Sequence, residues 1–583
     1  MTRSFTSVLV ANRGEIAVRV IRTCIEEGLR AIAVYSETDA GAPHVRMADE
    51  AHALPGRTAA ETYLSIPAII EAALLSGAEA IHPGYGFLSE SAEFAAAVTD
   101  AGIVWIGPPP AAIEALGDKV TARDIARRVG APLVAGTPGP VAGSAEVEEF
   151  VREHGLPIAI KAAFGGGGRG MRVVRDASQI SEAFEAATRE STAAFGRGDC
   201  FVEQYLERPR HVEAQILADE HGNVVVVGTR DCTLQRRHQK LVEEAPAPFL
   251  SDEQRCTIHD AAKAVCREAG YVGAGTVEFL VDVQGVISFL EVNTRLQVEH
   301  PVTEETAGVD LVSEQLSIAR GEPLRLTSDP EPRGHSIEFR VNCEDPAAGF
   351  APSPGVITTW EMPQGPGIRV DAGAEAGSEV SGLFDSMVAK LIVSGPTRAS
   401  ALARSRRALR DIRITGVPTV LDLDAKILDD PAFTAADGDF AVHTEWVGEN
   451  LDRLLAPLDD QADDDTSVRV HLGRRTLQVA LPGLSTLSPE TAERIRAQSA
   501  ELAVSESAHH GDDVLSPMQG TIIRVGVADG DAVKVGDPIA VLEAMKMENP
   551  VLAHRSGQVS GLTVAVGETR GQGELICRIV DAD

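Results

Sequence analysis

The sequence contains no stretch approaching about eighteen consecutive apolar residues, so no membrane-spanning helix is expected. It also lacks a basic excess. A formal net charge of -33 argues against nucleic acid and anionic membrane surfaces as partners. Residues 1–4 lead almost directly into the strand-like segment 8–10, and this leaves no room for a signal peptide.

The sequence also shows no pattern of paired cysteines. The seven cysteines, an odd number, lie at positions 24, 200, 232, 256, 266, 343 and 577 without paired or metal-binding spacing. This scatter favours a reducing cytoplasm. A chain of 583 residues with 44% hydrophobic residues is long enough for several domains with real cores. We therefore expect a folded, multi-domain cytoplasmic protein.

Lysine is scarce, with eight lysines among 53 basic residues. A lysine retained against this bias is expected to do what arginine cannot, because its compact ammonium fits phosphate or a small anion and its amine can be acylated. Lys119, Lys161, Lys240 and Lys546 lie in the motifs below. Lys263, Lys426 and Lys534 are interpreted as products of coding bias, and Lys390 stays unassigned.

The N-terminal part alternates apolar strands with helical patterns. Strand-like segments at 8–11, 31–35, 80–81 and 104–106 are separated by helical patterns from Glu15 and through 68–75. This rhythm predicts a parallel, doubly wound sheet. Two loops, 12–15 and 82–90, lie at strand ends, where such sheets place ligands.

A glycine loop follows the apolar strand 158–160. Residues 164–170 contain five glycines, at 165–168 and 170, and they begin three residues after Lys161. Consecutive glycines let backbone amides close over phosphate oxygens while a lysine supplies charge. The spacing fits neither a Walker loop nor a dinucleotide fingerprint. A flexible linker is the alternative, and the position between two strands makes it the weaker one.

Two carboxylates face each other in a predicted hairpin. A two-residue turn at Gln284-Gly285 pairs Val283 with Val286 and so places Glu278 directly opposite Glu291. Opposed carboxylates are destabilising unless a cation lies between them. Alternate residues after Glu291 stay polar, namely Asn293, Arg295, Gln297 and Glu299. Two carboxylates and an amide oxygen suit Mg²⁺ or Mn²⁺.

The C-terminal part nearly repeats itself. At an offset of 37 residues, Gly520 matches Gly557, and further matches fall at 527/564, 528/565, 530/567, 531/568, 536/573 and 537/574. Each half has alternating apolar residues and Gly-Asp or Gly-Glu turns, so each predicts a few strands of one small barrel. Lys546, within Met545-Lys546-Met547, falls at the hairpin that joins the halves.

This C-terminal stretch resembles the biotinyl carrier domain of biotin-dependent carboxylases. The resemblance implies that biotin is attached covalently to Lys546 by a biotin-protein ligase. Flanking methionines are adaptable enough to meet more than one partner. An unmodified lysine in a lipoyl-like barrel is the alternative.

The rest of the chain, from residue 8 to about 444, resembles the biotin carboxylase component, an ATP-grasp enzyme. The motifs that carry this resemblance are 11–17, 82–90, the glycine loop, 230–240 and 291–301. It implies an α/β multi-domain protein with a doubly wound N-terminal domain (1–116), an ATP-grasp domain (117–330) and an α+β C-terminal domain (334–444). A linker with a short strand pair (445–510) and an all-β biotinyl barrel (511–583) complete it.

The resemblance also implies residue roles. It places ATP against Lys119, Lys161, Gly167, Gly168, Glu203, Leu206, His211, Gln235 and His238. It places the metal on Glu278, Glu291 and Asn293, and bicarbonate against Lys240, Arg295, Gln297 and Val298. Glu299 is the implied general base, and Arg340 stabilises the enolate form of the ureido ring of biotin. A carboxylate base among so many cations should keep a low pKa.

The implied activity is ATP-dependent carboxylation of biotin by bicarbonate, through carboxyphosphate. Because no carboxyltransferase segment follows the carrier, we expect a separate carboxyltransferase beta subunit and an oligomeric assembly. The resemblance is to the alpha subunit of an acyl-CoA carboxylase acting on acetyl- or propionyl-CoA. The carboxylase subunit of a two-subunit pyruvate carboxylase and a non-catalytic biotinylated carrier remain as alternatives.

Overall fold

The computed structural model divides into two compact units, a carboxylase unit at 1–454 and a carrier unit at 455–583. The structure describes residues 3–162, 171–195, 197–436, 438, 440–456, 467–472, 475–480, 512–516, 520–544, 547–571 and 573–581. Gly167, Gly168 and Lys546 lie outside these residues. Among the helices that the structure describes, none has both the length and the apolar character needed to cross a bilayer.

The carboxylase unit begins with a five-stranded parallel sheet of order β3-β2-β1-β4-β5. Its strands are β1 (Ser7–Val10), β2 (Arg30–Tyr35), β3 (Glu50–Ala53), β4 (Ala80–His82) and β5 (Val104–Trp105). The helices between and after them are α1 (Gly14–Glu26), α2 (Pro43–Met47), α3 (Ile66–Ser76), α4 (Ala92–Asp100) and α5 (Pro110–Gly117). Val8 packs in one apolar core with α1, whereas Leu9 packs in another with α3 and α4. Helices therefore cover both faces, which confirms the predicted doubly wound sheet.

The two loops singled out in the sequence meet at the carboxyl edge of this sheet. They follow β1 and β4, which are neighbours at the point where the strand order reverses. The Asn12 Nδ2 donates to the carbonyl oxygens of Pro83 (2.7 Å) and Tyr85 (2.8 Å). One buried amide therefore ties the two loops together.

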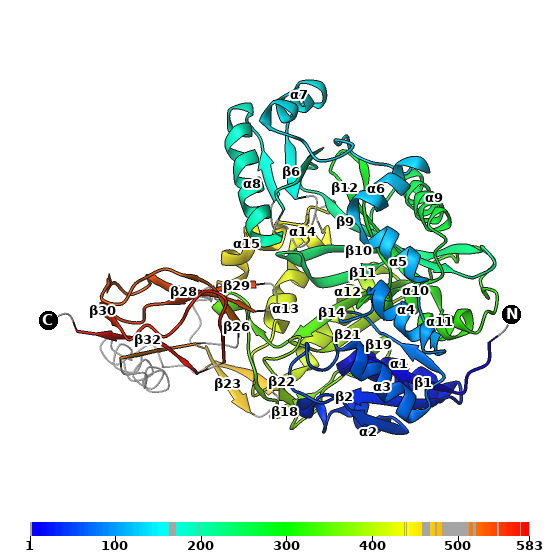
Figure 1. Ribbon diagram of the computed structural model, residues 1–583. Helices are drawn as coiled ribbons and strands as arrows, with labels where there is room; N and C mark the ends of the chain where they lie inside the picture. The colour runs from blue at the N-terminus through cyan, green and yellow to red at the C-terminus, as the bar shows by residue number, and fades with distance from the viewer. Residues whose placement is uncertain are drawn as a thin grey trace. The chain divides into compact units, whose positions relative to one another are not determined.

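A second, eight-stranded sheet runs through the middle of the unit (Figure 1). Its order is β13-β12-β9-β10-β11-β14-β21-β19, and every pairing is antiparallel. The strands are β9 (Arg210–Ala218), β10 (Val224–Arg236), β11 (Gln239–Ala245), β12 (Gly273–Val281), β13 (Ile287–Asn293), β14 (His335–Asn342), β19 (Ile368–Ala372) and β21 (Met387–Gly395). Because Val242 of β11 pairs with Phe339 of β14, segments on both sides of residue 330 belong to one sheet.

The helices of this part follow the same chain order. They are α6 (Lys119–Arg128), α9 (Asp252–Glu268), α10 (His300–Ala307), α11 (Leu311–Ala319), α12 (Arg398–Asp411), α13 (Leu421–Asp429), α14 (Pro431–Thr434) and α15 (Trp446–Leu455). Short strands β15 (Glu344–Asp345), β16 (Ala351–Pro352), β17 (Gly355–Val356), β18 (Thr359–Glu361), β20 (Glu379–Val380) and β22 (Arg413–Thr415) form two-stranded pairs.

The β12–β13 hairpin corrects the predicted turn while confirming the predicted pair. Glu278 lies directly opposite Glu291, as expected. The turn is longer than two residues, since the strands end at Val281 and resume at Ile287. A bulge then shifts the register, because Phe279 pairs with Phe289 while Glu278 pairs with Glu291. The strand also ends at Asn293, so the polar alternation beyond it does not continue as a strand.

A small three-stranded sheet has the order β7-β6-β8. It consists of β6 (Ile158–Ala162), β7 (Met171–Val174) and β8 (Cys200–Gln204), with α7 (Ser144–His154) and α8 (Ile180–Phe195). Lys161 pairs with Met171 across the glycine loop, so two antiparallel strands enclose it as predicted.

The carrier unit consists of two four-stranded sheets that map onto each other. One has the order β29-β28-β26-β31 and the other β25-β32-β30-β27. The strands are β25 (Asp513–Leu515), β26 (Gly520–Val525), β27 (Ala532–Val533), β28 (Pro538–Ala544), β29 (Met547–Leu552), β30 (Gly557–Ser560), β31 (Thr569–Arg570) and β32 (Leu575–Val580). The 37-residue offset that aligns the glycines also carries β26, β27 and β28 onto β30, β31 and β32. A separate pair, β23 (Ser467–Leu472) with β24 (Arg475–Ala480), confirms the short strand pair expected within 445–510.

The repeat in this unit has a local physical basis. The Asp531 carboxylate accepts from the Ala528 amide (2.7 Å), and the matching Glu568 accepts from the Ala565 amide (3.2 Å). Gly530 and Gly567 precede these acids with φ of 94° and 93°, values that favour glycine. β28 and β29 pair as far as Ala544 and Met547, on either side of the two residues that connect them.

Candidate active site

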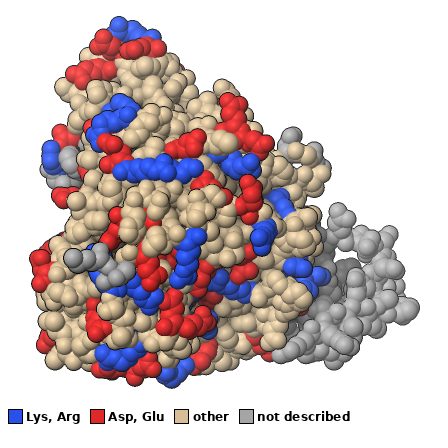
Figure 2. Space-filling model, turned by 90° about the vertical axis from the view of Figure 1, so that its right-hand side faces the viewer, with Lys and Arg blue, Asp and Glu red and all other residues tan. Residues whose placement is uncertain are grey.

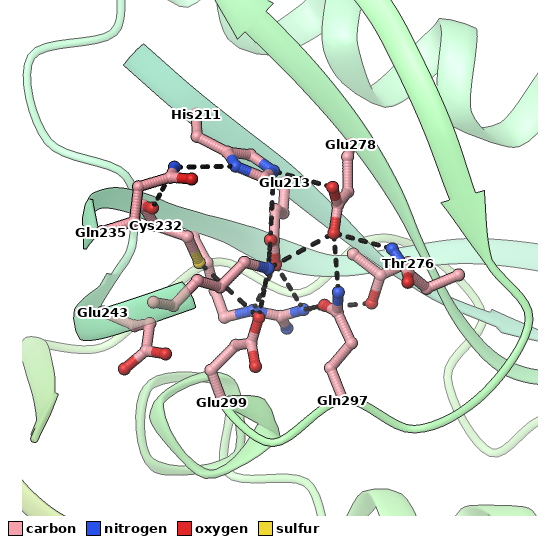
Figure 3. Close-up of polar contacts among 12 residues, drawn as sticks. His211, Glu213, Cys232, Gln235, Glu243, Thr276, Glu278, Gln297 and Glu299 are labelled. Atoms are coloured by element: carbon pink, nitrogen blue, oxygen red, sulfur yellow. Dashed lines mark hydrogen bonds and ion pairs between the residues drawn. The ribbon is translucent and has the colours of Figure 1, made fainter. Parts of the chain in front are cut away.

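Lys240 lies at the centre of a cluster of buried carboxylates. Its Nζ contacts Glu213, Glu299 (2.6 Å) and Glu278 (3.3 Å) (Figure 3). Glu213, Glu278 and Glu299 are at most 4% exposed. Buried carboxylates persist only when cations or hydrogen bonds compensate them, and one ammonium here serves three.

The sheet itself builds this cluster. Arg230, Glu213, Glu278 and Glu291 form one row across the neighbouring strands β10, β9, β12 and β13. Three carboxylates in adjacent positions repel one another unless cations approach from the face they share. Lys240 (3.3 Å) and His211 (2.9 Å) contact the Glu278 carboxylate. Lys119 contacts the Glu291 carboxylate at 3.3 Å.

Arg230 is the fully buried anchor of this row. Its guanidinium is 0% exposed and donates to Glu213, Gln215, Thr276, Gln297 and Thr303 at 2.6–3.2 Å. Sequence analysis placed Arg230 in a motif without predicting a role for it, and it did not identify Glu213 as a site residue. An available signal was the His211-x-Glu213 alternation within a strand, which places both side chains on one face.

Glu299 comes from the turn before α10 and is held by two cations. Lys240 contacts its Oε1, and the Arg340 Nη2 donates to its Oε2 at 3.0 Å. The Arg340 Nε also donates to Glu243 at 2.6 Å. Arg340 lies on β14, so the continuous sheet is what brings it to residues of β9–β13.

The cations decide the protonation of these carboxylates. Burial alone would raise the pKa of Glu299, but Lys240 and Arg340 outweigh it and hold that pKa well below the usual range. The pKa of Glu278 is likewise depressed against its burial, by Lys240 and His211. Burial, with the Glu299 and Glu278 carboxylates nearby, raises the pKa of Glu213 although Lys240 and Arg230 oppose the shift. The low pKa expected for Glu299 agrees with this geometry.

Arg295 and Gln297 extend the cluster toward the 82–90 loop. The Arg295 guanidinium donates to Glu90 (3.0 Å) and to the Asn293 Oδ1 (3.2 Å). The Gln297 amide donates to Glu278 at 2.8 Å. The 82–90 loop therefore contacts the segment just before the turn that contains Gln297, Val298 and Glu299.

The residues expected around ATP are partly assembled. Lys161 contacts the Glu203 carboxylate, which the Arg123 guanidinium also contacts at 2.8 Å. Gln235 lies 3.4 Å from the His211 ring, and the His211 Nε2 lies 2.9 Å from Glu278. Burial, with His211 and Lys119 nearby, lowers the pKa of His238. Leu206 and Val298 are half-buried, and no contact joins Leu206 to this group among the described contacts.

The expected metal ligands have a donor set that suits a hard cation. Glu278 and Glu291 face each other in register, and the Asn293 Nδ2 donates to Glu278 at 2.7 Å. Opposed carboxylates with a neighbouring amide oxygen match the oxygen ligands that Mg²⁺ prefers. The residues therefore fit the ion that their pattern predicts.

Family models match four consecutive stretches of the chain. They are the biotin carboxylase N-terminal domain (4–113), the carbamoyl-phosphate synthase L chain ATP-binding domain (118–327), the biotin carboxylase C-terminal domain (338–449) and a biotin-requiring enzyme domain (512–579). The fold, the buried site and these matches define the class, a biotin carboxylase joined to a biotin carrier domain.

Three relatives narrow this class, and the first of them matches the chain over almost its whole length. The biotin-dependent acyl-coenzyme A carboxylase alpha3 subunit of Mycobacterium leprae is 56% identical, over 98% of each chain. The biotin carboxylase of Nostoc sp. is 49% identical over 76% of this chain and 99% of the relative. The biotin carboxylase domain of 2-oxoglutarate carboxylase from Hydrogenobacter thermophilus, solved with MgADP, ADP and bicarbonate, is 45% identical with a TM-score of 0.72, covering 78% of this chain and all of that one.

The chain belongs to the family of biotin-dependent acyl-coenzyme A carboxylase alpha subunits. It is an ATP-dependent ligase that carboxylates biotin, and its family implies a carboxyltransferase partner. The resemblance stated from the motifs is therefore confirmed.

Proposed function

We propose that bicarbonate is activated by ATP beside Lys240, and that the carboxyl group is then passed to biotin on Lys546. The observation that carries this proposal is the meeting of Lys240 and Arg340 on the Glu299 carboxylate. Two cations beside a carboxylate form a site for a small anion, because they offer positive charge where water is largely excluded.

ATP is assigned to the side of the site that carries Lys119, Lys161, Glu203, Leu206, His211, Gln235 and His238, with Gly167 and Gly168 outside the described residues. Phosphoryl transfer depends on positioning and charge neutralisation more than on covalent help from the protein. Mg²⁺ held by Glu278, Glu291 and Asn293 would supply further neutralisation. The contact between Lys119 and Glu291 supports placing the lysine beside the phosphates.

Bicarbonate is assigned to Lys240, Arg295, Gln297 and Val298, with Glu299 as the base that accepts its proton. The oxygen so exposed attacks the γ-phosphorus, and ADP leaves with the electron pair of the broken bond. A depressed pKa keeps Glu299 ionised at neutral pH, so it is ready to accept a proton. Arg340, released from part of its pairing with Glu299, would stabilise negative charge on the acceptor.

When biotin is attached to Lys546, its ureido nitrogen gives up its proton and bonds to the carboxyl carbon of carboxyphosphate. The bond from that carbon to the phosphate oxygen breaks, and inorganic phosphate leaves with the proton. The described strands β28 and β29 support this assignment, because they pair up to the residues next to Met545-Lys546. We further propose that a biotin-protein ligase modifies Lys546, and that a separate carboxyltransferase beta subunit carries the carboxyl group to acetyl- or propionyl-CoA within an oligomer. The seven cysteines are all free thiols, which supports a reducing, cytoplasmic location.

The test is intact mass together with bicarbonate-dependent ATP cleavage, using free biotin as acceptor, on the wild type and on Lys546→Ala. We expect a mass gain of one biotin on the wild type alone, and equal cleavage by both proteins with free biotin. Biotinylation without bicarbonate-dependent cleavage would instead favour the non-catalytic carrier. Transfer to pyruvate rather than to an acyl-CoA, in the presence of the partner subunit, would favour the pyruvate carboxylase alternative.

A further inference from the structure

Lys390 is a fully buried lysine outside the cluster just described. Its side chain is 0% exposed on β21, a strand whose neighbours β14 and β19 belong to the same sheet. The Nζ donates to the carbonyl oxygen of Val298 at 2.7 Å and lies 3.2 Å from the Glu15 carboxylate. A buried ammonium with such specific partners needs a reason, since its burial is costly.

Lys390 and Arg340 are direct partners in the register of β14 and β21. Two cations at facing positions repel each other, so each must have its own acceptor. Arg340 has Glu299 and Glu243, whereas Lys390 has Glu15 and the Val298 carbonyl. Both cations therefore bind the dipeptide Val298-Glu299. Arg340 contacts the Glu299 side chain, and Lys390 contacts the backbone carbonyl of Val298.

We propose that Lys390 is a positioning residue for the bicarbonate turn, residues 297–299. The Val298 carbonyl and the Glu299 amide share one planar peptide group. A contact that fixes the direction of the carbonyl therefore also fixes the orientation of the Glu299 amide and the position of its Cα. The His300 Nδ1, 2.8 Å from the Gln297 carbonyl, holds the preceding peptide in the same way. Lys390 acts on the reaction through Val298 and Glu299 and does not touch substrate.

The ion pair between Lys390 and Glu15 also connects the two N-terminal loops to the turn at 297–299. Glu15, the last residue of the 12–15 loop, accepts from the Tyr85 hydroxyl of the 82–90 loop. Burial raises the pKa of Glu15, and Lys390 opposes that shift. Lys390 thereby connects both loops to the turn at 297–299, although these motifs are distant in sequence. This inference rests on the proposed roles of Val298 and Glu299.

The experiment compares Lys390→Met, Glu15→Gln and the double variant in the full biotinylated chain. Lys390→Met leaves Glu15 buried without its cation, so the thermal transition should fall. The KM for bicarbonate should rise roughly tenfold to a hundredfold while the KM for ATP changes less. The double variant removes both members of the ion pair, so its transition should recover while its bicarbonate KM stays high. Glu15→Gln alone keeps the Val298 contact and should keep the bicarbonate KM.

The matched control is Lys263→Met, which removes a half-buried lysine that pairs with Asp329 at 3.0 Å. Its bicarbonate KM should equal that of the wild type. Recovery of both stability and bicarbonate KM in the double variant would show that Lys390 only neutralises Glu15, and would overturn the proposal. Equal changes in the two KM values of Lys390→Met would overturn it as well. Full activity of Glu299→Gln would instead refute the proposed role of Glu299.

Discussion

The carboxylase unit and the carrier unit use their acidic residues in opposite ways. In the carboxylase unit, Glu213, Glu278 and Glu299 are buried together and compensated by cations from other strands. In the carrier unit, Asp531 and Glu568 are exposed and accept bonds from amides three residues earlier. On the face shown in Figure 2, basic and acidic side chains lie interspersed. In the carboxylase unit, cations from distant segments compensate the buried carboxylates of the site. In the carrier unit, the acids stabilise turns through hydrogen bonds to nearby amides.

The largest expected effect comes from removing the shared cation of the carboxylase unit. Lys240→Met leaves three buried carboxylates without their common partner, so bicarbonate-dependent ATP cleavage should fall by at least about a hundredfold. The unfolding free energy should fall by about 3–5 kcal/mol, the usual result of removing one partner of a buried ion pair. Steady-state kinetics and chemical denaturation measure the two losses.

Lys534→Met is the control for this change, because Lys534 is exposed on the carrier unit. It should leave both quantities unchanged. Retention of wild-type cleavage by Lys240→Met would remove Lys240 from the proposed site and break the comparison between the two units.

The second effect concerns acid. Burial lowers the pKa of His44 and of His82 to about 4, and both side chains are 0% exposed. Each imidazole takes up a proton near pH 6.5 in the unfolded chain but only near pH 4 in the folded one, so stability falls as pH drops between these values. The slope per histidine is about 1.4 kcal/mol per pH unit.

Scanning calorimetry of the full chain between pH 7 and pH 4 measures this loss. His44→Leu should lower the slope of stability against pH by the contribution of one proton, because it removes one of the two buried imidazoles that take up a proton on unfolding. His221→Gln, at an exposed position, serves as the control. An unchanged slope for His44→Leu would show that His44 is not one of the groups that take up protons.

The smallest effect tests the symmetry of the carrier unit. Asp531→Ala and Glu568→Ala each remove one acceptor from a matching turn, so each should cost about 1 kcal/mol of local stability. Hydrogen exchange at the Ala528 and Ala565 amides measures the loss at each turn. Carboxylation of free biotin should not change. A loss in one turn several times larger than in the other would contradict the equivalence of the halves.

The repeat of the carrier unit could be predicted because its causes are local. A positive-φ glycine followed by an acid specifies each turn within a few residues, and the same offset relates Ile539 to Ile576 in the core. The Glu278–Glu291 pair was also predictable from alternation, although the predicted two-residue turn was wrong. The bulge between Glu278 and Phe279 restored the predicted pairing, and alternation alone contains no signal for it.

By itself, the sequence determined the chemistry of the motifs, the parallel rhythm of the first sheet, the repeated turns and the lysines worth attention. Only the tertiary structure decided that Arg230 and Glu213 complete the row of carboxylates, that β11 and β14 join two regions into one sheet, and that Lys390 reaches Val298. The physical reason is separation along the chain. Turns and strand periodicity depend on neighbouring residues, whereas the compensation of a buried charge depends on which distant segments pack against it.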